Sequence, residues 1–180
     1  MKSFKDFLKE NDGKAYKVYC DMDGVLCDFI TGIMDTLHIA REPNQDEIEE
    51  FLGTLEGSSV DWWANLDWQP GGKRLWKMLK ELNTEILSAC PNQCKMTPNV
   101  IKGKKQWCKK NLKMTSGVNI TTRKGKIKFV APTHILIDDY KRNCDEWKAA
   151  GGLAIYHRDP KRTAKELRDT ILDLIKGELV

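Results

Sequence analysis

Short apolar runs alternate with stretches of helical periodicity along the 180-residue chain. The apolar runs predict five strands, at residues 16–20, 84–88, 118–121, 135–137 and 153–156. The periodic stretches predict helices at residues 3–11, 25–37, 45–52, 73–82, 99–111, 144–149 and 160–176. Strands that alternate with helices are typical of a parallel sheet with helices on both faces. The pattern therefore predicts an α/β fold of three layers, Rossmann-like in type.

Polar side chains gather where three of these strands end. Asp21 and Asp23 come after the first strand, Ser88 ends the second, and Asp138 and Asp139 come after the fourth. In a parallel sheet the carboxyl ends of the strands meet at one edge, where ligands bind. Carboxylates crowded there stay ionised when a cation lies among them, and Mg²⁺ is the usual ion beside phosphate. The sequence thus predicts a magnesium site at which one carboxylate attacks phosphorus and another handles the proton.

Three short motifs resemble those of the haloacid dehalogenase-like (HAD) phosphohydrolases. They are DMDGVLCDF at 21–29, ILS at 86–88 and ILIDD at 135–139. The sequences WWANL at 62–66 and PGG at 70–72 add a likeness to the 5′(3′)-deoxyribonucleotidases within that superfamily. The resemblance covers residues 16 to 157, and it implies the HAD version of the predicted fold.

The resemblance implies a role for each residue that matches a motif. Asp21 would be the nucleophile that becomes an aspartyl-phosphate, and Asp23 the general acid and base. Ser88 would donate a hydrogen bond to a phosphate oxygen. The catalytic lysine of the family lies ten residues before the acidic pair, which selects Lys128 to contact the phosphate and the nucleophile. Lys126 is its rival and is expected to support it at the phosphate.

The resemblance also implies Mg²⁺ as the cofactor. Asp21, Asp139 and the backbone carbonyl of Asp23 would hold the ion, with Asp138 nearby, behind the direct ligands or linked to the ion through a water molecule. The sequence therefore names four aspartates as candidate metal-site residues.

The segment between the first two motifs resembles a small helical cap inserted after the first strand. It divides the chain into a cap at 32–72 and a catalytic core at 1–31 and 73–180. Phe29, Trp62 and Trp63 would form an aromatic wall on which a nucleobase stacks. The alternative is that the tryptophans only join the cap to the core. Neighbouring residues on a helix point about 100° apart, which argues against both tryptophans facing one ligand.

Composition and charge narrow the class of protein. The chain has a net charge of +4 and no apolar run of the ~20 residues that cross a membrane. The charged N-terminus shows no signal segment, so a cytoplasmic location is expected. Lysines at 102–113 are expected on a solvated helix face, and those at 123–128 near phosphate. Six cysteines without metal-site spacing are expected to be reduced thiols, largely in the core.

The favoured function is a Mg²⁺-dependent phosphatase of (deoxy)nucleoside monophosphates, with a small-molecule nucleotide as the partner. An alternative keeps the chemistry and changes the substrate to nucleic-acid 3′ ends or another phosphorylated metabolite. An alternative of another class is a basic nucleic-acid-binding domain without catalysis. Nucleic acid is not the expected partner, because four acids at strand ends would repel its backbone. A homodimer, base preference and sugar preference are left open, and residues 89–91 (ACP) depart from the family pattern.

Overall fold

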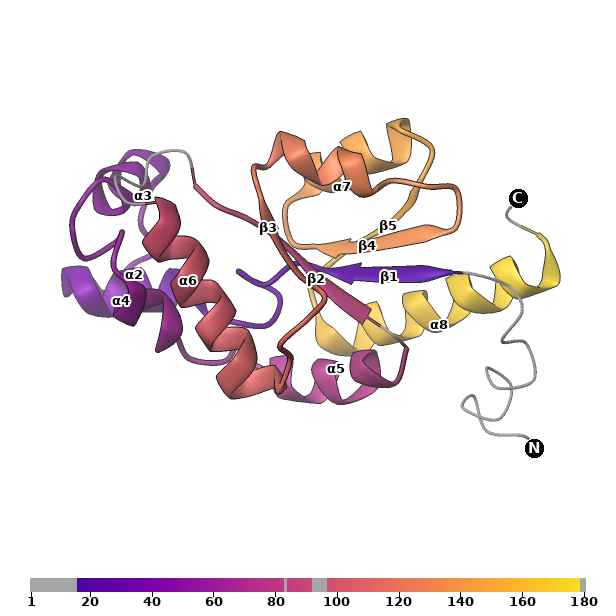
Figure 1. The fold of residues 1–180 in the computed structure, drawn as a ribbon, viewed down its shortest axis with the longest axis horizontal. Coiled ribbons are helices and arrows are strands. Elements are labelled where there is room, and N and C mark those ends of the chain that lie inside the picture. Colours follow the sequence, from indigo (N-terminus) through magenta and orange to yellow (C-terminus); the bar gives the residue numbers. More distant parts are fainter. Residues whose placement is uncertain (1–15, 83, 92–96, 179–180) are drawn as a thin grey trace.

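Five parallel strands form the centre of the protein. The computed structural model describes residues 16–82, 84–91 and 97–178. The strands are β1 (Lys17–Cys20), β2 (Thr84–Ala89), β3 (Val118–Thr121), β4 (His134–Asp138) and β5 (Leu153–Tyr156). They lie in the order β3-β2-β1-β4-β5, with all pairs parallel (Figure 1). This confirms the predicted α/β fold with a Rossmann-like sheet.

Helices cover both faces of this sheet. The core helices are α5 (Gly72–Leu79), α6 (Thr97–Trp107), α7 (Lys141–Ala149) and α8 (Pro160–Lys176). In Figure 1, α7 lies on one side of the sheet and both α5 and α8 lie on the other. Side chains alternate between the two faces of a strand, so neighbouring residues of β1 join different clusters. Val18 packs in the large cluster with α5 and α8, whereas Tyr19 packs with Trp147 of α7.

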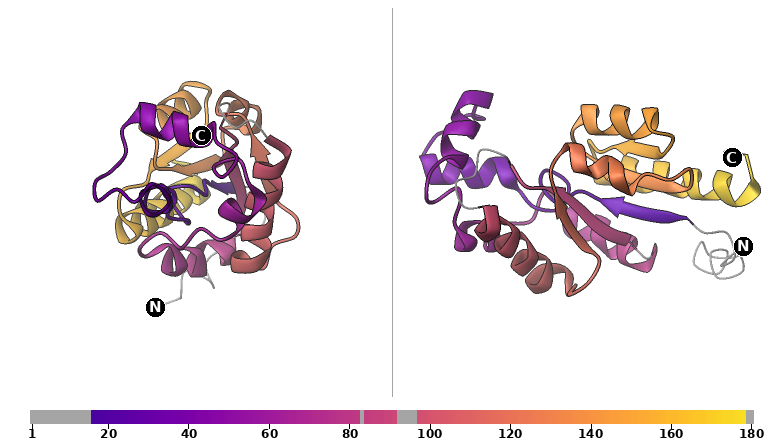
Figure 2. Two further views of the ribbon diagram at one scale, coloured as in Figure 1. Left: turned by 90° about the vertical axis from the view of Figure 1, so that its left-hand side faces the viewer. Right: turned by 45° about the horizontal axis from the view of Figure 1, so that its top comes forward.

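Helices are inserted after β1, as predicted, and the structure places three of them between β1 and α5. They are α2 (Phe29–Leu37), α3 (Gln45–Leu52) and α4 (Val60–Ala64). They form a lobe beyond the carboxyl ends of the strands, and the right-hand view in Figure 2 shows this lobe apart from α7 and α8. α4 packs closely on α6, because a Cβ atom on Gly103 would lie 2.6 Å from Trp63 Cβ and from the Val60 carbonyl oxygen. The inserted lobe therefore contacts the core through α6.

Local hydrogen bonds explain where some elements differ from the sequence prediction. The predicted helix at 25–37 begins only at Phe29, because residues 24–27 form a turn and the Asp28 side chain caps the Thr31 N–H. The short helix α4, capped by Ser59, was not predicted as a separate helix. A 3₁₀ helix at Lys124–Phe129 was also missed. The predicted helix at 3–11 lies outside the described residues.

The structure also bears on the predictions about the cysteines and about membrane-spanning segments. Five cysteines are free and buried, as predicted, and Cys94 lies outside the described residues. They are Cys20, Cys27, Cys90, Cys108 and Cys144. In the described part of the chain, no helix has the length and apolarity needed to cross a membrane.

Candidate active site

Asp21 lies at the carboxyl end of β1 and is 6% exposed. Its backbone N–H donates to the Ile137 carbonyl at 2.8 Å, so the chain still runs alongside β4 at this point. One carboxylate oxygen accepts from the Met22 N–H at 2.7 Å, and the other accepts from Lys126 Nζ at 2.7 Å. The strand and these two donors hold the carboxylate in one orientation.

Lys126 joins Asp21 to Asp138 at the end of β4. Its Nζ lies 2.7 Å from Oδ2 of each aspartate, and both Lys126 and Asp138 are buried. Asn143 Nδ2 lies 3.0 Å from both Asp138 oxygens, and the Tyr140 N–H donates to Oδ1 at 2.9 Å. Burial opposes the charged form of Lys126, but the two carboxylates outweigh it and raise its pKa above the usual range. Lys126 is therefore a buried cation that neutralises a pair of carboxylates.

A third carboxylate completes a candidate metal site. Asp21, Asp138 and Asp139 each offer an oxygen, and these oxygens all lie within 4.8 Å of one another. Burial, and after it the charge of Asp21, raises the pKa of Asp138 to about 6. Asp139 is exposed to solvent, but the protein atoms around its carboxyl group partly desolvate it; this desolvation, and after it the charges of Asp21 and Asp138, raises its pKa to about 8. Oxygen donors that repel one another in this way fit a hard divalent cation such as Mg²⁺.

Gly24 allows Asp139 to approach the other acids. Its φ is +70°, and a Cβ atom there would lie 2.0 Å from Asp139 Oδ2. We expect Gly24→Ala to displace the Asp139 carboxylate and to weaken cation binding, measured by calorimetric titration with Mg²⁺. Gly151→Ala is the matched control, because Gly151 has φ +92° and nothing within 4 Å. Backbone strain of about 1–2 kcal/mol is common to both variants, so equal Mg²⁺ affinity in the two would contradict this role of Gly24.

We expect the metal-free protein to lose stability as the pH rises from about 4 to about 8. The folded state raises the pKa of Asp138 to about 6 and of Asp139 to about 8, from an ordinary value of about 3.9. In this range the folded state therefore binds more protons than the unfolded state, and stability falls as they leave. Urea unfolding at pH 5 and pH 8 in EDTA measures the loss. Mg²⁺ should reduce it, and Asp139→Asn should flatten it; an unchanged slope in Asp139→Asn would refute the assignment.

A second buried lysine holds Asp23. Lys104 of α6 is 0% exposed, and its Nζ donates to Asp23 Oδ2, to Ser88 Oγ at 3.1 Å and to the Ala89 carbonyl at 2.7 Å. Burial raises the pKa of Asp23 above its usual range, Lys104 opposes this, and the charge of Asp21 adds to it. A carboxyl group with a raised pKa is suited to donate a proton. The structure thus brings Asp23 and Ser88 together, through a lysine that the sequence analysis did not select.

The position of Lys104 on its helix could have identified it as a buried residue from the sequence. Val100, Gly103, Trp107 and Cys108 form the buried stripe of α6 and the turn after it, and Lys104 falls within this stripe. A lysine on an apolar face needs a buried partner, because burial of an unpaired charge is costly. The expectation of a solvated face for residues 102–113 was therefore wrong at Lys104.

The structure brings Lys126, rather than Lys128, to the nucleophile candidate. Lys128 is exposed, and among the described residues it makes no ion pair with an aspartate at the strand ends. In the 3₁₀ helix Lys124–Phe129, three residues make one turn, so residues two apart point in different directions. The placement expected for Lys128 is corrected on this ground, and Lys126 occupies it.

The three aromatic candidates form one cluster but differ in exposure. Trp63 is 0% exposed: Phe29 stacks on it at 5.5 Å between ring centroids, and Lys104 Nζ lies 4.5 Å from its ring centroid. Trp62 is partly buried, packs against Phe51, and donates through Nε1 to Thr36 Oγ1 at 2.9 Å. The two tryptophan rings are inclined by 85°. Trp63 therefore joins the lobe to the core, and of the three residues only Phe29 and Trp62 are partly exposed.

Comparisons with known proteins bear on the fold. No protein-family model and no curated protein sequence matches the chain. Matching solved structures include a hydrolase from Streptococcus pneumoniae TIGR4, with a TM-score of 0.51 and 11% sequence identity. The match covers 86% of this chain and 98% of that one. At this identity the two proteins are shown to share a fold, and the activity of this chain has to be inferred from its own residues.

Proposed function

We propose that this protein is a Mg²⁺-dependent phosphatase that hydrolyses (deoxy)nucleoside monophosphates through an aspartyl-phosphate. One observation carries the proposal: two carboxylates two residues apart, Asp21 and Asp23, are each paired with a different buried lysine. Lys126 keeps Asp21 oriented at the end of β1, and Lys104 connects Asp23 to Ser88. This arrangement gives the two carboxylates different environments and hence different roles.

The chemistry assigned to these residues has two steps. Asp21 attacks phosphorus, the bond from phosphorus to the ester oxygen breaks, and Asp23 gives its proton to the leaving oxygen. A water molecule then attacks phosphorus in the aspartyl-phosphate and loses a proton to Asp23, which releases phosphate and restores Asp21. The raised pKa of Asp23 favours its protonated form for the first step.

The positive and polar groups around Asp21 are assigned to the phosphate. Lys126 is charged and within hydrogen-bond distance of Asp21, so its ammonium group also neutralises a phosphoryl oxygen bound there. The Ser88 hydroxyl, which accepts from Lys104, is left free to donate to another oxygen. Asp21, Asp138 and Asp139 would hold Mg²⁺. When bound, the ion supplies positive charge that offsets the carboxylates and the phosphate.

The substrate class rests on the lobe and on the motif resemblance. Phe29 and Trp62 are partly exposed residues of the lobe beyond the strand ends, and the resemblance to the deoxyribonucleotidases implies that they contact the base. An aromatic face stacks on a nucleobase with about 1–3 kcal/mol per base. The structural neighbour from Streptococcus pneumoniae is a hydrolase, which agrees with the reaction class.

Phosphate release from a panel of substrates tests this function. The panel contains ribo- and deoxyribonucleoside 5′- and 3′-monophosphates, a 3′-phosphorylated oligonucleotide and p-nitrophenyl phosphate, each with Mg²⁺ and with EDTA. We expect release from mononucleotides that requires Mg²⁺. Release only from the oligonucleotide, or only from p-nitrophenyl phosphate, would keep the chemistry and reject the nucleotide assignment. Absence of release from every substrate with Mg²⁺ would reject the phosphatase.

We expect the cost of Asp23→Asn to depend on the leaving group. Loss of general acid catalysis costs about 10²–10⁴-fold when the leaving oxygen is strongly basic, as in a nucleotide. The p-nitrophenolate ion leaves without a proton, so the first step should be affected far less with that substrate. Single-turnover rates with both substrates measure the difference. An equal loss for both would assign Asp23 a role other than proton donation to the leaving group.

A further inference from the structure

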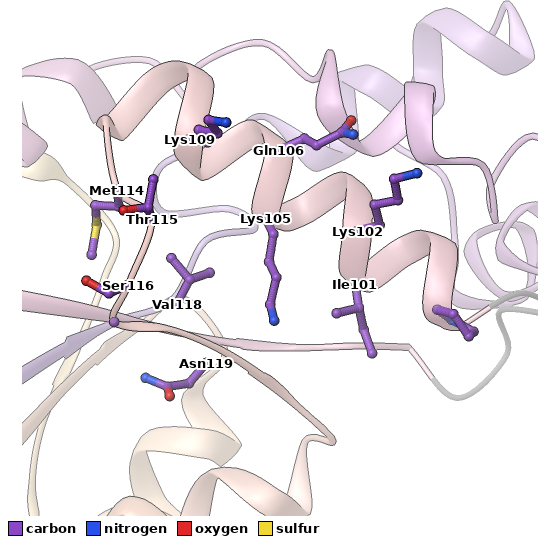
Figure 3. A pocket seen from close by; sticks show the side chains of 12 residues that line it. Ile101, Lys102, Lys105, Gln106, Lys109, Met114, Thr115, Ser116, Val118 and Asn119 are labelled. Carbon is purple, nitrogen blue, oxygen red and sulfur yellow. The ribbon is translucent and has the colours of Figure 1, made fainter.

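A groove of about 650 Å³ lies between α6 and the edge strand β3, on the outside of the core (Figure 3). Three lysines of α6 and the turn after it line the groove: Lys102, Lys105 and Lys109. In Figure 3, Lys105 points from α6 toward the sheet edge that carries Val118 and Asn119. None of the described residues that line the groove is acidic.

The groove lysines lie on a different face of α6 from Lys104. Spacings of three and four residues place Lys102, Lys105 and Lys109 in one row, which spans about 10 Å at the rise of a helix. Lys104 is buried and turned toward Asp23. The α6 helix and the turn after it therefore direct Lys104 to the strand-end acids and place the other three lysines along the groove.

Among the described residues, no acidic side chain pairs with these three lysines. Some exposed cations on other helices pair with an acid four residues on, as Lys141 does with Asp145 and Arg162 with Glu166. In the part of the chain that is described, no groove lysine makes an ion pair. Glu85, which lies beside Gly117 at the end of the groove, is bound by Lys17 and by Asn119 Nδ2.

Basic and acidic residues are also unevenly distributed along the sequence. Residues 86–137 contain eleven lysines and arginines and no aspartate or glutamate. Since the whole chain carries +4, the remainder carries −7. Lys104, Arg123 and Lys126 of this segment pair with acids from other parts of the chain. The remainder includes the three groove lysines, and this excess of positive charge favours an anionic ligand.

The remaining lining indicates a small ligand with an organic part. Ile101, Met114 and Val118 offer apolar surface, while Thr115 and Ser116 offer hydroxyl groups. A volume of about 650 Å³ lies within the range of small-molecule sites, which combine apolar walls with a few polar groups. We propose that this groove binds a small molecule that carries two or more phosphates on an organic moiety, as a nucleoside triphosphate does. The site is separate from the strand-end carboxylates, and the inference does not rest on the proposed phosphatase activity.

A nucleic-acid strand is the competing occupant. Proteins that bind single strands without sequence preference combine a basic groove with aromatic side chains that stack on bases. The described residues that line the groove include no aromatic side chain. The groove therefore fits a compact polyphosphate better than a strand of bases.

Calorimetric titration of the full chain with ATP, in EDTA, tests the proposal. The variant is Lys102→Gln/Lys105→Gln/Lys109→Gln, and the matched control is Lys77→Gln/Lys80→Gln/Lys148→Gln, which removes the same charge from exposed positions elsewhere. We expect one ATP per chain, affinity at least tenfold weaker in the groove variant, and unchanged affinity in the control. Lys105→Gln alone should weaken binding in the same direction, which covers the case of a triple variant that does not fold.

Four results would overturn the proposal. They are the absence of ATP binding, equal loss in both triple variants, undiminished binding in the groove variant, and tighter binding of a single-stranded oligonucleotide than of ATP at the same salt concentration. Inorganic triphosphate should bind more weakly than ATP, because it lacks a moiety for the apolar wall. Equal affinity for inorganic triphosphate and ATP would contradict the assignment of the apolar wall to an organic moiety of the ligand.

Discussion

Asp21→Asn is expected to abolish turnover while the protein stays folded. The amide is a poor nucleophile, so no aspartyl-phosphate forms, and loss of a residue that acts directly on the substrate lowers kcat by at least about a thousandfold. The fold is expected to persist because the change also removes one of three carboxylates that crowd within 4.8 Å. Phosphate release from the best mononucleotide of the panel and thermal unfolding by circular dichroism measure the two effects.

The matched control for this variant is Asp35→Asn, an exposed acid on α2. We expect it to keep full activity. Covalent labelling gives a measurement that does not depend on protein stability. When a reaction with labelled substrate is quenched, labelled phosphate should be found on the wild-type chain and not on Asp21→Asn. Full activity of Asp21→Asn, or trapped phosphate on it, would contradict the assigned nucleophile.

Lys126→Met is expected to destabilise the fold strongly. Lys126 is 2% exposed and lies 2.7 Å from carboxylate oxygens of Asp21 and Asp138. Removal of one partner from a buried ion pair leaves an uncompensated charge, which typically costs about 3–5 kcal/mol. Urea unfolding in EDTA measures the free energy of unfolding, and the same variant should lose phosphatase activity.

Lys128→Met is the matched control, two residues away in the same 3₁₀ helix and exposed. A surface change of this kind usually shifts stability by no more than about 0.5 kcal/mol. Adding Asp138→Asn to Lys126→Met should restore part of the lost free energy of unfolding, because it removes one of the buried charges left without a partner. If Lys126→Met and Lys128→Met unfold at the same urea concentration, the buried ion pair is not formed in solution.

The acids of the site could be predicted from sequence because their positions depend on local pattern. Strands that end at residues 20 and 138 of one parallel sheet bring their terminal residues, and those directly after them, to the same edge. The oxygens of Asp21, Asp138 and Asp139 meet there. The carboxylate of Asp23 pairs with Lys104 and lies outside this group. The family resemblance implied only the backbone carbonyl of Asp23 as a metal ligand, and that expectation stays a prediction.

The lysines of the site could not be assigned in this way. Counting residues back from Asp138 selects Lys128, but the phase of a 3₁₀ helix decides which lysine points inward, and it selects Lys126. Lys104 belongs to a run of lysines that is typical of a solvated surface until the apolar stripe of its helix is considered. Composition identifies a basic segment, whereas helical phase identifies which of its residues are buried.

The sequence by itself determined the order of the elements, the parallel sheet and the strand-end acids, because periodicity and strand ends are properties of neighbouring residues. Only the tertiary structure decided which lysine meets which acid, and that Trp63 is buried in contact with both Phe29 and Lys104. It also decided that one side of α6 faces Asp23 and the other lines a separate basic groove. The physical reason is that these contacts join distant segments, and their geometry depends on close packing such as that of α4 on Gly103.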